Sequence, residues 1–594
     1  MRELEYPFDP EWMRKKKRKI KKQLLEELPK GAITKKIAIL GGSTFDEVRD
    51  MLELFLLNYG IVPSFYSSEY NSFYEDGMFD NPELIEFAPD LIYIHTSFKN
   101  IDALPMPNDS GDTVQEKYES VINKFKGLWE HLLSKYSCPV IQNNFDYPFY
   151  RLLGNNDAVL IQGRVRFVRA LNHEFADFAL QHENFFINDI NYQQAVYGID
   201  KWSDPLYWNM YKYALAVPAI PAFSYNLASI IKAIYGRNKK ALSLDLDNTL
   251  WGGVIGDDGP DNIEIGMETP TGQIYAEFQT YLKELMSMGV LLTVNSKNDE
   301  SVAREGFERP DSVLKKDDFI GFKANWEPKD RNLAGVAQDI NLTTDSFVFV
   351  DDNPAEREIV KTSLTGTAVP DIGNAEDYIR TLDRAAYFEV VRLSQDDLDR
   401  NAMYLANAKR QESEVQFKDY GEYLDSLLME AEIKPFSSVY YSRIAQLTNK
   451  SNQFNLTTKR MSQSDIERIA EDDGYITLYG KLKDRFGDNG VVSVAYGKVC
   501  GDVLDIEMWL MSCRVLKRDM EKAMMDELIR ICLLRGIHTL RGHYYPTAKN
   551  GMVKDFFAER GFEKVDEDEA GNTLWERKIS FDEMAESRYI KVNP

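Results

Sequence analysis

Cysteine is scarce in this chain: four residues in 594, at Cys138, Cys500, Cys513 and Cys532. None of them forms a CxxC pair or a Cys/His pattern with metal-ligand spacing. So few thiols in so long a chain exclude a disulfide framework and a cysteine-based metal centre. The sequence therefore indicates a reducing compartment, and we expect a cytoplasmic protein.

Basic residues are also too few to balance the acidic ones, with 71 Lys and Arg against 95 Asp and Glu and a net charge of −24. This excess disfavours nucleic acid and anionic membranes as partners, because their phosphates would be repelled. The run from Arg14 to Lys22 is a local exception. Its positive charge could bind phosphates. The apolar residues Ile20, Leu24 and Leu28 recur at helical spacing, however, which favours a helix with a solvated basic face.

Long apolar runs are missing as well. The amino terminus has no apolar signal region, and no stretch approaches the roughly 20 apolar residues of a membrane-spanning helix. A P-loop of the form GxxxxGK[ST] is not found either, so nucleotide chemistry is not expected.

The length favours three or four domains of roughly 150 residues each. Apolar, β-branched segments alternate with helical patterns in the first two regions, which is typical of parallel strands joined by helices. The third region has antiparallel strand patterns after a polar, helix-rich linker from Ser394 to Phe417. The predicted fold is multidomain α/β, with domains at 1–235, 236–390 and 391–594.

The most informative segment is Asp245-Leu246-Asp247-Asn248-Thr249, which directly follows the apolar run Ala241–Leu244. Carboxylates two residues apart at a strand end can face one crevice. Such a pair suits phosphoryl chemistry, with one acid as nucleophile and the other as acid/base. A divalent cation such as Mg²⁺ would offset the repulsion from a phosphate.

Suitable partners follow downstream, near the ends of further predicted strands. Ser296 offers a hydroxyl, with Lys297 beside it as a substrate-binding candidate. Lys329 offers a positive charge to the phosphoryl group and the nucleophile. Asp351 and Asp352 follow the run Ser346–Val350 and are suited to complete a metal shell. The segment Trp251-Gly252-Gly253 allows either close backbone approach to a ligand or a simple tight turn.

Four strings carry a family resemblance: Asp245–Gly259, Asn295–Asp299, Asn325–Lys329 and Phe349–Arg357. They resemble the FkbH-like family of the haloacid dehalogenase (HAD) superfamily. The resemblance implies a central HAD-like Rossmannoid domain of three αβα layers. It also implies a magnesium enzyme that dephosphorylates 1,3-bisphosphoglycerate and loads the glyceryl group onto an acyl carrier protein.

The same resemblance implies a role for each motif residue. Asp245 would be the nucleophile, Asp247 the acid/base, and Ser296 and Lys329 the phosphate binders. The candidate metal ligands are Asp245, Asp247, Asp351 and Asp352. The candidate substrate-binding residues are Ser296, Lys297, Asn248, Thr249, Trp251 and Gly252.

The carboxy-terminal region is similar to GNAT acyltransferases, and its cysteine is the candidate carrier of the acyl group. Cys513 follows a strand pattern and has Arg514, Lys517 and Arg518 nearby, which would favour a thiolate. A buried small hydrophobic residue is the alternative interpretation, and Cys532 fits that alternative better. Relatives tend to have glycine where this chain has Lys517 and Asp519, and Asp519 would repel a coenzyme pyrophosphate. Docking of a carrier protein's phosphopantetheine arm is therefore favoured over coenzyme A.

Two polar residues of the same region, His543 and Asn550, are weaker candidates, for which surface or turn roles are favoured.

The amino-terminal region resembles the flavodoxin-like SGNH-hydrolase fold, with Ser43 at the serine position. No histidine lies between His182 and His538, so the expected base is missing. His95 and His173 are possible substitutes, but a binding or docking role is favoured for this domain. Two rival functions stay open for the whole chain: a plain phosphatase for another small phosphorylated metabolite, and a non-catalytic scaffold for carrier proteins.

Overall fold

The computed structural model describes residues 1–29, 31–414, 416–451, 453–547, 549–580 and 587–593. The chain divides into two compact units. Unit 1 comprises Met1–Leu4 and Phe8–Ile234, and unit 2 comprises Glu5–Pro7 and Tyr235–Pro594. The expected multidomain α/β character is confirmed.

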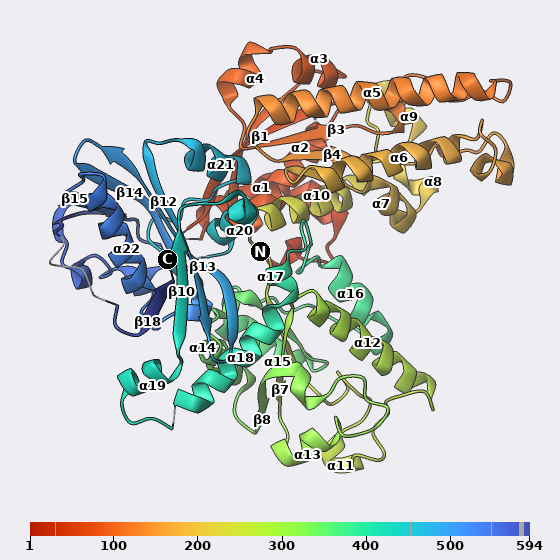
Figure 1. Ribbon diagram of the computed structural model, residues 1–594. Coiled ribbons are helices and arrows are strands. Elements are labelled where there is room, and N and C mark those ends of the chain that lie inside the picture. The colour runs from red at the N-terminus through yellow and green to blue at the C-terminus, as the bar shows by residue number, and fades with distance from the viewer. Residues whose placement is uncertain (30, 415, 452, 548, 581–586, 594) are drawn as a thin grey trace. The chain divides into compact units, whose positions relative to one another are not determined.

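Unit 1 is built on a parallel five-stranded sheet of order β2-β1-β3-β4-β5. Figure 1 labels its strands β1, β3 and β4. The central strands are apolar and buried on both faces, as parallel strands between helical layers must be. The alternation of strands and helices predicted for this region is confirmed. Its strands are β1 (Ile33–Gly41), β2 (Ile61–Ser67), β3 (Leu91–His95), β4 (Val140–Asn143) and β5 (Phe185–Asn188).

Helices of unit 1 cover both faces of this sheet. Helices α5 and α6 pack on the side chains of Ala38 and Leu40, while α2 packs against α1 and α10. The helices of unit 1 are α1 (Pro10–Glu26), α2 (Asp46–Asn58), α3 (Phe73–Met78), α4 (Pro82–Phe87), α5 (Gly111–Lys135), α6 (Arg164–Gln181), α7 (Ile190–Tyr197), α8 (Ile199–Trp202), α9 (Pro205–Tyr211) and α10 (Ile220–Ile234).

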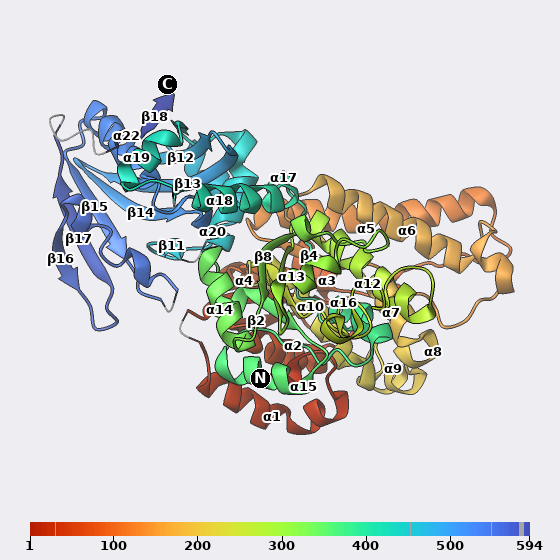
Figure 2. The ribbon, with the colours of Figure 1, turned by 90° about the horizontal axis from the view of Figure 1, so that it is seen from below.

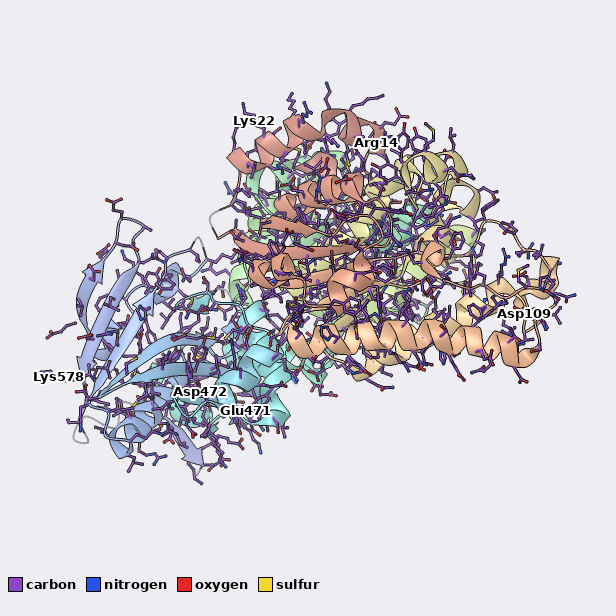
Figure 3. All side chains as sticks on the ribbon, turned by 90° about the horizontal axis from the view of Figure 1, so that it is seen from above. Arg14, Lys22, Asp109, Glu471, Asp472 and Lys578 are labelled. Atoms are coloured by element: carbon purple, nitrogen blue, oxygen red, sulfur yellow. The ribbon has the colours of Figure 1, made fainter. Side chains whose placement is uncertain are left out.

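The basic run lies on α1. Its first and last residues, Arg14 and Lys22, are labelled in Figure 3. The apolar residues Ile20 and Leu24 of α1 are buried. Lys17 forms ion pairs with Glu47 and Asp50 of α2, at 3.0 and 2.8 Å. The helix-face interpretation of the run is therefore confirmed, because part of its charge is neutralised by acidic residues of the same unit.

One helical stretch, Val217–Ile234, has the length and hydropathy of a membrane span, among the residues described here. It is 78% buried inside the structure. The helix α10 accordingly has the character of a core helix, since its apolar surface is already covered by protein.

The first sheet of unit 2 is parallel and four-stranded, in the order β8-β7-β6-β9. Helices α12 and α16 cover one face, and α14 and α15 cover the other, so three αβα layers result as expected. Its elements are β6 (Ala241–Leu244), α11 (Ile255–Asp258), α12 (Pro270–Ser287), β7 (Leu291–Ser296), α13 (Glu300–Glu305), β8 (Phe319–Ala324), α14 (Lys329–Asp339), β9 (Phe347–Val350), α15 (Pro354–Ser363) and α16 (Tyr378–Arg384).

The second sheet of unit 2 is mixed, as Figures 1 and 2 show. Strands β10, β12, β13 and β14 are antiparallel, and β14 then pairs in parallel with β15 along Val503–Ile506 only. The strands are β10 (Met429–Lys434), β11 (Phe454–Asn455), β12 (Tyr475–Asp484), β13 (Gly487–Cys500), β14 (Val503–Met511), β15 (Thr539–Tyr544), β16 (Glu563–Glu567), β17 (Thr573–Lys578) and β18 (Ile590–Asn593).

The polar segment that was predicted to be a linker is instead part of the packed structure. It forms α18, which contacts both β8 of the first sheet and β13 of the second. Its Tyr404 is buried, and its Arg410 donates to Asp484 at 2.8 Å in the interior. The sequence looked polar because buried ion pairs hold this helix. The helices here are α17 (Gln395–Leu398), α18 (Arg400–Glu414), α19 (Tyr420–Ser426), α20 (Tyr441–Lys450), α21 (Gln463–Glu471) and α22 (Met520–Leu534).

Candidate active site

The acidic motifs of unit 2 meet at the carboxyl ends of three neighbouring strands. Leu244 of β6 is paired with Val294 of β7 on one side and with Val350 of β9 on the other. Asp245 and Asp351, the next residues after β6 and β9, therefore leave the sheet side by side. The Asp245 backbone N–H also donates to the Val350 carbonyl at 2.9 Å.

Lys329 lies between these two carboxylates. Its Nζ is 2.9 Å from Asp245 Oδ2 and 2.6 Å from Asp351 Oδ2. Burial alone would lower the pKa of Lys329, but the charges of Asp245 and Asp351 outweigh it and raise the pKa. The lysine is thus held as a cation inside the site, where a phosphoryl group would need positive charge.

The carboxylates of Asp245, Asp351 and Asp352 converge, with ligand atoms within 4.8 Å of one another. Burial, and then the charge of Asp245, raises the pKa of Asp351 to about 6. Asp245 Oδ1 is buried and has no hydrogen-bond partner among the residues that the structure describes. An oxygen-rich, under-neutralised group of this kind fits Mg²⁺, which prefers carboxylate ligands.

Asp247, which the sequence also proposed as a ligand, is not part of this converging group. Its Oδ1 accepts hydrogen bonds from Trp251 Nε1 at 2.9 Å and from the Ile255 N–H at 3.0 Å. Its Oδ2 accepts from Asn298 Nδ2 at 3.0 Å. Burial raises the pKa of Asp247 in spite of these donors. A fixed carboxyl group with a raised pKa suits the acid/base role better than the metal shell.

Trp251 was expected to bind substrate, and this expectation needs correction. Its side chain is fully buried and packs edge-on against Phe307, with 5.2 Å between the ring centroids. Because its indole N–H donates to Asp247, it acts as a positioning residue. Gly252 is buried and exchanges two backbone hydrogen bonds with Glu264, at 3.0 and 2.8 Å. The tight-turn interpretation of this segment is therefore the better one.

Asn248 and Thr249 also stabilise the loop after β6. Asn248 has a left-handed backbone, φ 53°, and its side-chain oxygen accepts from the Gly253 N–H at 3.0 Å. Thr249 is buried, and its hydroxyl oxygen accepts from the Asp352 N–H at 3.3 Å. Both residues tie the acidic loops together, and neither side chain offers its bonded atoms to a ligand.

The neighbouring residues Ser296 and Lys297 differ in exposure: the first is buried and the second is exposed. Ser296 is the last residue of β7 and is buried at the same edge of the sheet as Asp245. The ammonium of Lys297 is directed elsewhere, since it pairs with Glu356 of α15 at 2.5 Å. Ser296 therefore keeps its predicted place beside the acidic group, and Lys297 does not face it as an unpaired charge.

Comparison with known proteins gives one match to unit 1 and one that covers 64% of the chain. Residues 36–232 match the family model described as FkbH, N-terminal domain. A crystal structure of the N-terminal part of the protein BF1531 from Bacteroides fragilis, containing a phosphatase domain complexed with Mg, is 30% identical in sequence. It covers 64% of this chain and 99% of its own, with a TM-score of 0.58. The chain belongs to the FkbH-like family.

Other comparisons of this FkbH-like chain are weaker. The ribosomal-protein-S18-alanine N-acetyltransferase from Escherichia coli matches at 14% identity, covering 25% of this chain and 95% of its own, with a TM-score of 0.21. A PaiA N-acetyltransferase from Thermoplasma acidophilum in complex with coenzyme A matches at 15%, covering 25% and 99%, with a TM-score of 0.19. Such TM-scores establish no common fold. No curated protein matches the chain in sequence.

Cys513 of the FkbH-like chain lies outside the acidic site. It begins a short 3₁₀ turn (Cys513–Val515) after β14, and its Sγ lies 3.8 Å from Tyr404 Oη. It lines a cavity together with Lys240, the residue before β6. Asp245 follows the other end of β6, five residues later, which is roughly 16 Å along an extended strand. Of the four predicted catalytic residues, Asp245, Asp247 and Lys329 belong to the acidic site and Cys513 does not.

The loop after Cys513 has a backbone that glycine would favour. Lys517 and Asp519 have left-handed conformations, with φ 63° and 61°. Arg518 is turned inward and donates to Asp484 at 3.2 Å, so it does not face the thiol as an unpaired cation. Asp519 directly precedes α22 and brings a carboxylate to the amino terminus of that helix. This placement agrees with the expectation that the loop binds a pyrophosphate poorly.

Ser43 and its possible bases are not assembled into a hydrolase triad. Ser43 is buried and its Oγ has no hydrogen-bond partner in the described part of the chain. His95 Nδ1 bonds to Tyr93 Oη at 2.8 Å, and burial lowers the pKa of His95 to about 4. His173 is largely exposed on α6 and faces Asp177. The SGNH-like assignment stays a prediction, and the binding interpretation is the one that this geometry favours.

Two minor candidates have structural partners. His543 Nε2 is 2.7 Å from Asp505 Oδ1, across neighbouring strands. Asn550 is fully buried, and its Oδ1 accepts from the Thr547 N–H at 2.7 Å. The turn role predicted for Asn550 is confirmed by this bond.

Sequence reasoning missed two residues that hold the site together. Asn298 donates to Asp247, and Arg357 donates to the carbonyls of Asp351 and Asp352 at 2.8 and 2.7 Å. Both lie within the strings that carry the family resemblance, so the signal was present. Their roles depend on side-chain direction, which the spacing of the motifs does not give.

Proposed function

We propose that this FkbH-like chain is a Mg²⁺-dependent enzyme that dephosphorylates 1,3-bisphosphoglycerate and passes the glyceryl group through a thiol to an acyl carrier protein. The observation that carries the phosphatase half is the buried Asp245 Oδ1, which accepts no hydrogen bond from the described residues and lies beside Lys329 and two further carboxylates. The Mg-bound phosphatase domain of BF1531 supports the same chemistry.

The residues of the acidic site divide the phosphatase step among them. Asp245 Oδ1 attacks phosphorus, and the bond from phosphorus to the leaving oxygen breaks. Asp247, held by Trp251 and Asn298, gives that oxygen a proton and afterwards takes one from the attacking water. Lys329 and Ser296 hold the phosphoryl oxygens. Asp245, Asp351 and Asp352 would hold Mg²⁺, which supplies further positive charge to the phosphoryl group.

The substrate has an acyl phosphate at one end and a phosphate ester at the other, and we assign each end to a different site of the protein. Breaking the phosphorus–oxygen bond of the acyl phosphate would release a carboxylate and lose its activation. A glyceryl thioester therefore forms only if a thiolate attacks the carbonyl carbon, the carbon–oxygen bond breaks and phosphate leaves with the electron pair. We assign this acyl transfer to Cys513 and the removal of the phosphate ester to Asp245. This agrees with the position of the Cys513 cavity at the amino end of β6 and of Asp245 at its carboxyl end.

Incubation of the full chain with 1,3-bisphosphoglycerate, Mg²⁺ and an acyl carrier protein tests the proposal. We expect phosphate release together with a glyceryl-sized mass increase on the enzyme or the carrier. Asp245→Asn should reduce phosphate release from the phosphate ester by on the order of 10³-fold or more, while the phosphate expelled in the acyl transfer should still appear. The exposed Asp261 lies in the same region, and Asp261→Asn is the matched control that should keep the release from the ester. Phosphate release without any adduct would contradict the transfer half and favour a plain phosphatase.

A further inference from the structure

The cavity beside Cys513 is lined by an unusual concentration of positive charge. Its walls come from the residues before β6 and β9, from α18 and α20, and from the turn after β14. No acidic residue is found among the described residues that line it. The cationic lining residues are Lys240, Arg400, Arg443, Lys450, Arg514 and Lys549.

Carboxylates outside the cavity wall pair with several of these cations. Arg400 and Lys450 share Asp397, which is 2.7 Å from Lys450 Nζ, and Lys549 pairs with Asp345. The ammonium of Lys240 makes no ion pair or hydrogen bond with the described residues. Burial, together with the charges of Arg400 and Lys549, lowers the pKa of Lys240. Cations held together in this way repel one another, and a bound anion would relieve the repulsion.

Hydroxyl groups and an arginine complete the donor set. Ser512, Tyr404 and Thr343 also line the cavity, and the Arg514 guanidinium donates to Ser512 Oγ at 3.1 Å. Lysine, arginine and hydroxyl donors around one space are the groups that bind phosphate oxygens. Cys513 Sγ belongs to the same wall, so a phosphate held here would bring the atoms attached to it close to the thiol.

The nearest alternative site for a phosphate is poorly suited to one. The amino terminus of α22 would attract an anion through its N–H groups. Asp519 stands at that position, and Glu521 in the first turn contacts Arg560 at 3.4 Å. Asp519 also pairs with Lys522 at 3.0 Å, so the cations at this terminus are engaged by carboxylates that lie at the site itself. The described residues that line the cavity include no carboxylate.

We infer that the cationic cavity around Cys513, and not the amino terminus of α22, binds the phosphate of the ligand that reacts at the thiol. Two sources carry this chemistry: the acyl phosphate of the substrate and the phosphopantetheine arm of a carrier protein. The inference rests on the transfer half of the proposed function for its choice of ligands. The binding itself is measurable without any transfer.

Alkylation of the full-length protein tests the inference, with Cys500 as the internal control because it is exposed and outside the cavity. Iodoacetate is an anion and iodoacetamide is neutral, so their rates at each cysteine, read by peptide mass spectrometry, report local charge. We expect iodoacetate to be favoured at Cys513 over Cys500, and inorganic phosphate to slow it at Cys513 by at least about threefold. Lys240→Met should remove most of this difference, and Lys450→Gln serves as a second variant.

Further arms of the experiment separate the two sources. S-methyl phosphopantetheine is compared with S-methyl pantetheine, and 3-phosphoglycerate with glycerate. Stronger protection of Cys513 by S-methyl phosphopantetheine than by 3-phosphoglycerate assigns the cavity to the carrier arm, and the reverse order assigns it to the substrate. Equal reaction rates with and without every phosphate, unchanged in Lys240→Met, would overturn the inference. Protection without any glyceryl transfer would overturn the proposed function and leave the cavity's assignment standing.

Discussion

Lys240 and Asp245 lie at opposite ends of one strand, β6, and each belongs to a different polar site. The carboxyl end of the strand carries the acidic group with Lys329, and the amino end carries the cationic cavity with Cys513. A single strand thus separates acidic phosphoryl chemistry from a thiol in a basic environment. The two halves of the proposed reaction can therefore be disabled independently.

Cys513→Ser should abolish the glyceryl adduct and leave phosphate release from the phosphate ester within about twofold of the unmodified chain. The reason is that Lys240, which lines the cavity of the thiol, and Asp245 are separated by roughly 16 Å along β6. Intact-protein mass spectrometry and a phosphate assay on the same sample measure both halves. Cys500→Ser is the matched control and should change neither. A Cys513→Ser variant that still forms the adduct would remove this thiol from the mechanism.

Trp251→Phe should shift the pH dependence of phosphate release to higher pH. The indole N–H stabilises the charged form of Asp247, so its removal raises the pKa of that carboxyl group further. A hydrogen bond to a charged group contributes about 1.5–3 kcal/mol, which corresponds to about one pKa unit or more. The alkaline limb of kcat/KM against pH should move by that amount. Trp326→Phe, at an exposed tryptophan, should leave the profile in place.

Lys329→Met should destabilise unit 2 by about 3–5 kcal/mol, because Asp245 and Asp351 would lose the cation between them. Added Mg²⁺ should restore part of this loss, since a ligand that binds only the folded state stabilises it. Thermal unfolding with and without Mg²⁺ measures both effects. The exposed pair of Lys323 with Asp339 provides the control, for which Lys323→Met should cost at most about 1 kcal/mol. Equal unfolding temperatures for the two variants would contradict the assignment.

His95 should make unit 1 less stable in mild acid. Burial lowers its pKa from 6.5 to about 4, so the unfolded chain takes up a proton that the folded chain excludes. This contribution to stability is present above pH 6.5 and is lost as the pH falls towards 4, by about 2 kcal/mol between pH 7 and pH 5. Denaturant unfolding of the full chain at both pH values measures it, and the loss should be smaller in His95→Gln. An identical loss in that variant would contradict the prediction.

The order of strands and acidic motifs was predictable because it depends on local patterns. Ala241–Leu244 is a mainly apolar segment, broken only by Ser243, and the acids follow directly, so the carboxyl edge of the sheet could be placed from spacing alone. The role of Trp251 was not predictable, because an indole next to two glycines fits a ligand contact and a core contact equally well. Its burial depends on Phe307, which lies far away in the sequence.

The position of Cys513 could not be derived either. Local sequence placed it after a strand, but its neighbours Lys240 and Tyr404 come from regions more than a hundred residues away. The polar segment that contains Tyr404 looked like a linker because the acid that pairs with its buried Arg410 is the distant Asp484. Long-range ion pairs of this kind leave no periodic signal in the sequence.

The left-handed residues Lys517 and Asp519 have a consequence for redesign. Each holds a backbone shape that costs an L-amino acid about 1–2 kcal/mol and glycine almost nothing. Glycine at both positions would relieve that strain and would remove the Asp519 carboxylate from the amino terminus of α22. The carboxylate of Glu521 in the first turn of α22 would remain, so Glu521→Gln is the third substitution needed to present this helix terminus to an anion without rebuilding the backbone.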